Sequence, residues 1–108
     1  MKSLVIHAPD HAVKGRGATS FEHILSTSVG PGYAISNNDI GKLTIPGSPV
    51  ILLRKDRHKA RAEGRLIEIV PTGKYTRNGR QRYDVRIASL KLVVYKKENL
   101  NRFGYALI

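Results

Sequence analysis

Cysteine is absent from the chain, and this absence excludes disulfides and thiolate metal sites. Long apolar runs are also absent, because none approaches the roughly 18 residues that a membrane-spanning helix needs. The apolar part of segment 1–11 is too short for a secretory signal peptide. We therefore expect a cytoplasmic protein with no membrane partner.

Acidic residues are scarce relative to basic ones. Eight Asp and Glu stand against 19 Lys and Arg, which gives a formal net charge of +11. A surplus of this size favours a partner with dense negative charge, and nucleic acid, either RNA or DNA, is the commonest such partner. A basic protein-interaction module is the alternative that needs no nucleic acid. The 108 residues suffice for one domain, to which we assign 1–108.

The stretch 49–70 organises the rest of the sequence. An apolar run at 50–53 reaches a charged turn at 54–58, and a second arm follows, so we expect two strands and a tight connection. In the second arm the small residues before Gly64 and the isoleucines after it occupy different phases of the strand period. Keeping one face inward needs an extra residue near Gly64, which predicts a bulge or a sharp bend there.

The dipeptide Asn78-Gly79 is the clearest local signal, and it favours a two-residue type I′ hairpin turn. This register pairs Arg77 with Arg80. It also pairs Tyr75 with Arg82 and places all four side chains on one face. Facing arginines repel one another, so the cluster favours an anionic partner. A solvated hairpin tip with no role is the alternative.

Shorter elements are expected on both sides of these hairpins. Residues 3–8 predict a buried strand, and Thr19 stands at capping-box spacing from Glu22, which predicts the start of a short helix. We expect 30–32 to end this helix and 71–73 to break the chain again. Polar residues at 37–39 predict a cap on a single helical turn, and a change of apolar phase after 88–89 predicts a barrel corner.

These elements add up to five to seven strands and one or two short helices. Strands outnumber helices and lie close together in the sequence, which favours a barrel with helices at its ends. The fold class that we predict is mainly β with short helices, in the form of a small β-barrel.

The order of segments resembles the PUA-like superfamily, which includes PUA, ASCH and EVE domains. The resemblance rests on an N-terminal strand LVIHA, a loop with a helix, the segment LTIPGSPV, and the strands GRLIEIV and RYDVRIASL. It covers most of the chain and implies a single PUA-like domain over 1–108. A likeness to EVE domains implies a reader of modified or flipped bases in nucleic acid. A likeness to ASCH domains implies the alternative of a small RNA-directed hydrolase or nuclease.

The candidate site residues form three groups. Arginine suits phosphate because its planar fork donates two bonds at once, and tyrosine stacks on unpaired bases. We expect no metal and no cofactor, and no catalytic residue follows from spacing, so a binding protein is favoured over an enzyme. The nucleic-acid group is Arg54, Lys55, Arg57, Arg61, Arg65, Tyr75, Arg77, Arg80 and Arg82. A pocket group, which the PUA-like resemblance brings to a ligand cleft, is His7, Tyr33, Ser36, Asn37 and Asn38. An anion loop before the first helix holds Lys14, Arg16 and Thr19.

Overall fold

A computed structural model describes residues 1–8, 20–55 and 58–108 of the chain. Six strands and two short helices are formed by these residues, in the order β1 (Leu4–His7), α1 (Phe21–Thr27), β2 (Val29–Tyr33), α2 (Asn37–Ile40), β3 (Pro49–Arg54), β4 (Ala60–Tyr75), β5 (Gln81–Val93) and β6 (Tyr105–Leu107). The prediction of a mainly β fold with five to seven strands and short helices is confirmed.

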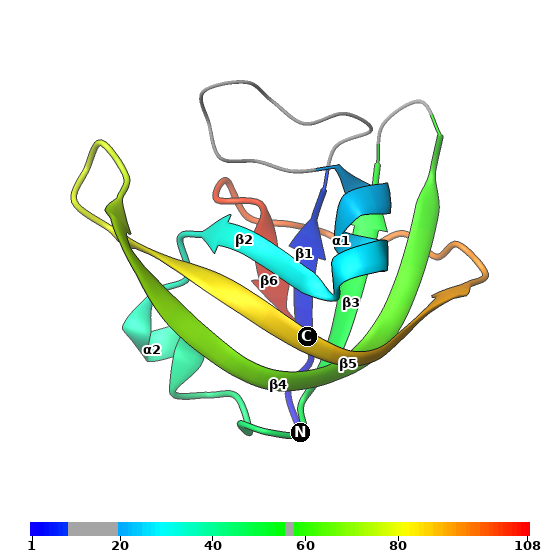
Figure 1. The fold of residues 1–108 in the computed structure, drawn as a ribbon, viewed down its shortest axis with the longest axis horizontal. Coiled ribbons are helices and arrows are strands. Elements are labelled where there is room, and N and C mark those ends of the chain that lie inside the picture. The colour runs from blue at the N-terminus through cyan, green and yellow to red at the C-terminus, as the bar shows by residue number, and fades with distance from the viewer. Residues whose placement is uncertain (9–19, 56–57) are drawn as a thin grey trace.

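All six strands belong to one sheet with the order β2-β5-β4-β3-β1-β6. The pair β1–β3 is parallel, and the other four pairs are antiparallel. Figure 1 shows how the long strands β4 and β5 curve together, so that the sheet curls into a half-barrel. The two edge strands, β2 and β6, are not hydrogen-bonded to each other.

The inner face of this half-barrel carries the main core. Alternate residues of β1, β3, β4 and β5 point into it, and α1 adds Phe21 and Ile24, which are fully buried. Burial of such side chains is the main favourable term in folding. The buried members are Leu4, Ile6, Ala8, Phe21, Ile24, Ile35, Val50, Leu52, Ala62, Leu66, Val85, Ile87 and Tyr105.

A second, smaller core lies on the outer face of the sheet. Val5, Ile51 and Leu53 are buried there under side chains of the segment that follows β5, including Tyr95 and Leu100. Strands β1 and β3 are therefore covered on both faces. This explains why their sequences are continuous apolar runs and not alternating ones.

The pairing of β4 with β5 is irregular at Gly64, where the two backbones approach closely. The pairing of β4 with β5 shifts register between Glu63 and Arg65, so the predicted irregularity at Gly64 is confirmed. The extra residue lies in β5, at Ser89, whose φ of 56° is unusual for a residue with a side chain. A Cβ on Gly64 would lie 2.6 Å from the carbonyl oxygen of Ala88, so only glycine allows the two backbones to approach this closely.

The slip predicted after 88–89 is confirmed as a register shift, because the extra residue of β5 falls there. The apolar residues beyond it do not return to the core as a set, because Leu92 is 61% and Val94 is 91% exposed. The change of phase in β4 was placed wrongly. Leu66 continues the inward set of Ala62, and the phase changes only at Ile67, where a second register shift leaves this side chain 43% exposed. A one-residue bulge therefore returns Ile69 to the core side.

Two segments predicted to interrupt the chain are parts of strands. Residues 30–32 belong to β2, where a bulge accommodates Pro31 at the sheet edge and the N–H of Gly32 donates to Asp84 Oδ1 over 3.1 Å. Residues 71–73 belong to β4, where another register shift occurs and the Thr72 hydroxyl donates to the Arg82 carbonyl over 2.9 Å. Side chains replace the missing ladder bonds in both places.

Helix α1 is capped by Ser20, whose hydroxyl accepts from the N–H of His23 over 3.2 Å. The cap predicted at Thr19 is therefore one residue too early, and Thr19 itself lies outside the described residues. Ser28 in the left-handed conformation ends the helix before 30–32 is reached. The predicted single helical turn is confirmed as α2, but the cap expected at 37–39 was placed too late, because Ser36 is the cap and 37–39 lie within the turn.

Candidate nucleic-acid interface

The turn between β4 and β5 is one residue longer than predicted. The N–H of Thr76 donates to the Arg80 carbonyl over 2.8 Å, and the N–H of Gly79 donates to the Thr76 carbonyl over 2.9 Å, so three residues form the loop. Gly79 has a φ of 81°, whereas Asn78 is not among the residues with positive φ, which excludes a type I′ turn. The Thr76 hydroxyl fixes this geometry by accepting from the N–H of Arg80 over 3.0 Å.

This register separates the four side chains that were expected on one face. Tyr75 pairs with Gln81 and not with Arg82, and it is 60% exposed. Arg80 pairs with Thr76 and therefore lies on the face opposite Tyr75. Arg77 lies in the loop and is exposed. The prediction of a single face shared by Tyr75, Arg77, Arg80 and Arg82 was wrong.

A different partner gathers the arginines at this end of the molecule. The guanidinium of Arg80 lies 3.8 Å from the centre of the Phe103 ring, and that of Arg102 lies 4.8 Å from the same centre. Both are attracted by the negative face of the aromatic ring. The ring thus brings two cations from distant parts of the chain close together. No sequence signal marked Phe103 or Arg102.

Two of the hairpin arginines also hold the backbone that follows β2. Arg80 Nη2 donates to the Ala34 carbonyl over 2.9 Å, and Arg82 Nη1 donates to the Gly32 carbonyl over 2.7 Å. Each guanidinium is thereby fixed in direction by a charge-assisted bond while its remaining N–H groups are left for other acceptors. We call the tip surface the cations of this hairpin together with the Phe103 stack: Lys74, Arg77, Arg80, Arg82, Arg102 and Phe103.

The acids of the described chain are already engaged elsewhere. Five of them form ion pairs, and the sixth, Asp84, accepts from the N–H of Gly32. No cation of the tip surface pairs with a carboxylate among the described residues. The five acids in ion pairs are Glu22, Asp39, Glu63, Glu68 and Glu98, and their partners are Arg54, Lys42, Arg61, Arg86 and again Arg61.

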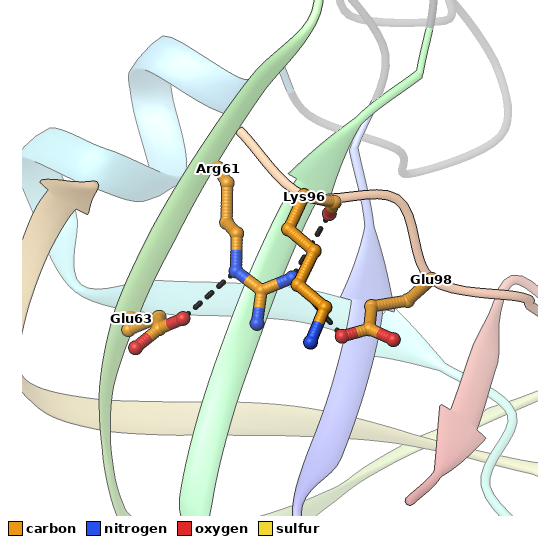
Figure 2. Close-up of polar contacts among 4 residues, drawn as sticks. All are labelled: Arg61, Glu63, Lys96 and Glu98. Carbon is orange, nitrogen blue, oxygen red and sulfur yellow. Dashed lines mark hydrogen bonds and ion pairs between the residues drawn. The ribbon is translucent and has the colours of Figure 1, made fainter. Parts of the chain in front are cut away.

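Arg61 was predicted to belong to the nucleic-acid group, but its side chain is buried. It is 6% exposed, and Figure 2 shows its guanidinium between two carboxylates. Arg61 Nε donates to Glu63 over 2.8 Å, while Nη1 donates to Glu98 over 3.0 Å and to the Lys96 carbonyl over 2.9 Å. Burial by itself would lower the pKa of Arg61, but the bonds and charges of both carboxylates raise it above its usual value.

The other members of the predicted nucleic-acid group that lie between 54 and 65 differ in their contacts. Arg54 is 14% exposed at its side chain, pairs with Glu22 over 3.0 Å, and stacks on the Phe21 ring. Its Nε also donates to the His58 carbonyl. Arg65 is exposed and has only a long bond of 3.4 Å to the Gly47 carbonyl. Lys55 is half-buried, and Arg57 lies outside the described residues.

Four of the five predicted pocket residues make contacts within the fold. The Tyr33 hydroxyl donates to the His7 carbonyl over 2.8 Å, and burial raises the pKa of Tyr33 well above its usual value, so it remains a neutral donor. Ser36 caps α2, and Asn37 accepts from Tyr83 over 2.8 Å. Asn38 is exposed. The side chains of Tyr33, Ser36 and Asn37 are therefore engaged within the fold.

Next to them, Asp39 accepts from the Tyr105 hydroxyl over 2.6 Å. This bond is the largest cause that lowers the pKa of Asp39, and Ser36 and Lys42 act in the same direction against a smaller effect of burial. Asp39 is therefore a fixed anion that ties α2 to β6. It is an internal partner for Tyr105 and was not part of the predicted pocket.

The predicted anion loop of Lys14, Arg16 and Thr19 lies outside the described residues. Among residues 1–8, 20–55 and 58–108, no group of three His, Asp or Glu side chains could hold a metal ion. No helix within these ranges is long and apolar enough to cross a membrane.

Comparison with known proteins adds no relative: no family model, no curated protein and no solved structure matches the chain.

Proposed function

We propose that the protein binds nucleic acid, RNA or DNA, through the tip surface. The observation that carries the proposal is the distribution of charge. Every acid of the described chain already has a partner, and none of these carboxylates pairs with the five cations of the tip surface. Two of these cations are brought together on one phenyl ring, where they repel each other. A phosphate backbone relieves this repulsion and accepts the N–H groups that remain.

The tip surface also has neighbours suited to bases. Tyr75 is 60% exposed on the opposite face of the same hairpin, so an unpaired base that passes the tip finds an aromatic ring to stack on. The resemblance of the sequence to PUA-like domains supports the same proposal. The PUA-like resemblance also implies a more specific form of this function, the recognition of a modified or flipped base. The curled, mainly β sheet is compatible with that resemblance.

The test is a titration of labelled 20-mers of single-stranded and duplex RNA and DNA at several salt concentrations. If all five cations of the tip surface contact phosphates of a single strand, the log–log slope of affinity against salt approaches about −3.5. A slope near zero for all four ligands contradicts the proposal. It would leave the basic protein-interaction module or the ASCH-type enzyme as the function to test.

A matched pair of double variants localises the effect. Arg77→Ala with Arg102→Ala removes two exposed cations from the tip surface. Lys2→Ala with Lys97→Ala removes two exposed cations that are not part of it. We expect the first pair to flatten the salt slope by about 1.4 for a single strand, and the second to leave it nearly unchanged. Equal effects of both pairs would mean that total charge, and not the tip surface, governs binding.

A further inference from the structure

A cavity of about 400 Å³ lies on the outer face of the sheet, away from the main core. Its polar lining comes from alternate residues of β4, namely Arg61, Glu63 and Arg65, and from Ser89 at the bulge of β5. Pro49 and Ile51 of β3 line it as well. We call this cavity the outer groove. A volume of this size falls within the range of small-ligand sites, where a few polar groups lie among apolar ones.

The buried guanidinium of Arg61 has one nitrogen left over in the outer groove. Its Nε and Nη1 atoms make all three of its hydrogen bonds, to Glu63, Lys96 and Glu98. Figure 2 shows the third nitrogen with no bond to the residues drawn. The Arg61 side chain is 7% exposed and is held in place by its bonds through Nε and Nη1. The two N–H groups of Nη2 are therefore donors of fixed direction that an acceptor of a ligand can use.

The charges of the outer groove select a neutral ligand. Arg61 is compensated by Glu63 and Glu98 together, so these three groups carry a net charge of −1. Arg65, which has no carboxylate partner among the described residues, returns the sum to zero. An anion gains little attraction in such a field, whereas a neutral group with both donors and acceptors fits it.

The backbone at the outer groove is shaped by a strained residue. Ser89 has a φ of 56°, and its exposed side chain lines the cavity opposite Gly64. Residues in this conformation cost energy and are often found where a site requires them.

We propose that the outer groove binds a guanine base. Glu63 uses one carboxylate oxygen for Arg61, and the other is left to accept from the N1–H and N2 amine of guanine. The free N–H groups of Arg61 and the guanidinium of Arg65 donate to O6 and N7, the acceptors with which arginine most often recognises this base. Adenine, cytosine and uracil do not combine two adjacent donors with two acceptors in this way.

The proposal is tested with the full chain labelled with ¹⁵N, titrated separately with GMP, AMP, CMP and UMP at about 0.15 M salt, where attraction between exposed charges is weak. Guanosine and inorganic phosphate are added as separate titrations. We expect GMP and guanosine to shift the amide signals of Gly64 and Ser89, with an affinity at least about tenfold higher than that of the other nucleotides. Shifts caused equally by phosphate, or by all four nucleotides, overturn the proposal.

Two glutamates of β4 provide a matched control. Glu63 and Glu68 are 47% and 44% exposed at their side chains, and each pairs with an arginine over 2.8 Å, but only Glu63 lines the outer groove. We expect Glu63→Gln to weaken GMP binding by about tenfold or more and Glu68→Gln to leave it unchanged. Equal effects of the two variants overturn the proposal.

A second variant keeps the test decisive if Glu63→Gln disturbs the fold. Ser89→Asn retains a residue that tolerates positive φ and places a larger side chain in the outer groove. We expect it to reduce GMP affinity while the amide spectrum remains folded, and unchanged affinity contradicts the proposal. Because mononucleotide binding in the outer groove does not need the tip surface, its failure and a flat salt slope with 20-mers are separate outcomes.

Discussion

Arg61 lies on β4 and Arg80 directly precedes β5, yet the two arginines are used in different ways. Arg61 is buried between Glu63 and Glu98, and its charge is neutralised within the fold. Arg80 stacks on Phe103 next to Arg102, and no carboxylate of the described chain pairs with it. The comparison shows that a count of basic residues does not reveal which of them are available to a partner. The partners of each one decide that.

The largest expected effect is that of replacing Arg61. Arg61→Met keeps the length of the side chain but leaves Glu98, which is 16% exposed, without its cation. We expect the free energy of unfolding to fall by about 3 kcal/mol, because an unpaired buried charge is costly. Denaturant titration measures this, and adding Glu98→Gln should restore part of the loss. A loss below about 0.5 kcal/mol would place Arg61 among ordinary surface residues.

The close approach of β4 and β5 at Gly64 gives the second prediction. Gly64→Ala would place a Cβ 2.8 Å from Ile87 Cγ2 as well as close to the Ala88 carbonyl. We expect a loss of about 2 kcal/mol, since neither strand can move apart without breaking the bend. Gly41→Ala is the control, because a Cβ there meets its nearest neighbours at 3.5 Å and φ is −63°. Similar losses for both glycines would mean that the contact between Gly64 and β5 is not tightly packed.

The third prediction concerns Tyr105→Phe, which removes the hydroxyl that donates to Asp39. We expect a loss of about 1.5 kcal/mol at pH 7, because a bond to a charged acceptor of 2.6 Å is removed. The pKa of Asp39 is lowered in the folded protein, so its contribution is present above the unfolded pKa and disappears as the pH falls through the folded one. Unfolding measured from pH 7 downward should therefore show the two proteins converging in acid. A difference that stays constant with pH would contradict this account.

Arg80 itself should have a moderate effect. Arg80→Ala removes the stack on Phe103 and the bond to the Ala34 carbonyl, so we expect a loss of about 1 kcal/mol in stability. Arg80→Lys keeps the charge but not the planar fork, and it should recover only part of the loss. Full recovery with lysine would show that charge alone matters.

The smallest expected effect is that of Arg77→Ala. Arg77 is exposed in the hairpin loop, and no contact of its side chain is present among the described residues. Stability should change by less than about 0.5 kcal/mol, while nucleic-acid affinity falls with the loss of one phosphate contact. A thermal melt beside the salt titration separates the two effects. A large drop in melting temperature would show that the loop arginine is structural.

Sequence patterns predicted the elements whose cause is local. Side-chain type and period alone predict the continuous apolar runs of β1 and β3, the single helical turn of α2 and the register shift at Ser89. The type of hairpin turn did not follow, because Asn78-Gly79 suits both a two-residue and a three-residue loop. The Thr76 hydroxyl, bonded to the N–H of Arg80, decides between them.

The candidate site depended mostly on long-range contacts. Glu98 lies 37 residues from Arg61, and Phe103 comes from the loop before β6, so no local pattern links either to its arginine. The exposed Arg77 and the exposed Tyr75 were identifiable from the hairpin sequence. Burial of Arg61 was not, because alternation along β4 gives the face of a residue but not what covers that face.

The pairing of β1 with β6 has a consequence for synthesis of the protein. β1 is synthesised before the other strands, and it has no outer neighbour until Tyr105–Leu107 emerge. Backbone bonds of 2.8 and 3.0 Å between Ser3 and Ile108 then complete this side of the sheet. During translation the apolar edge of β1 is therefore open to nascent-chain contacts, and a chaperone that binds extended apolar segments would act on it in this interval.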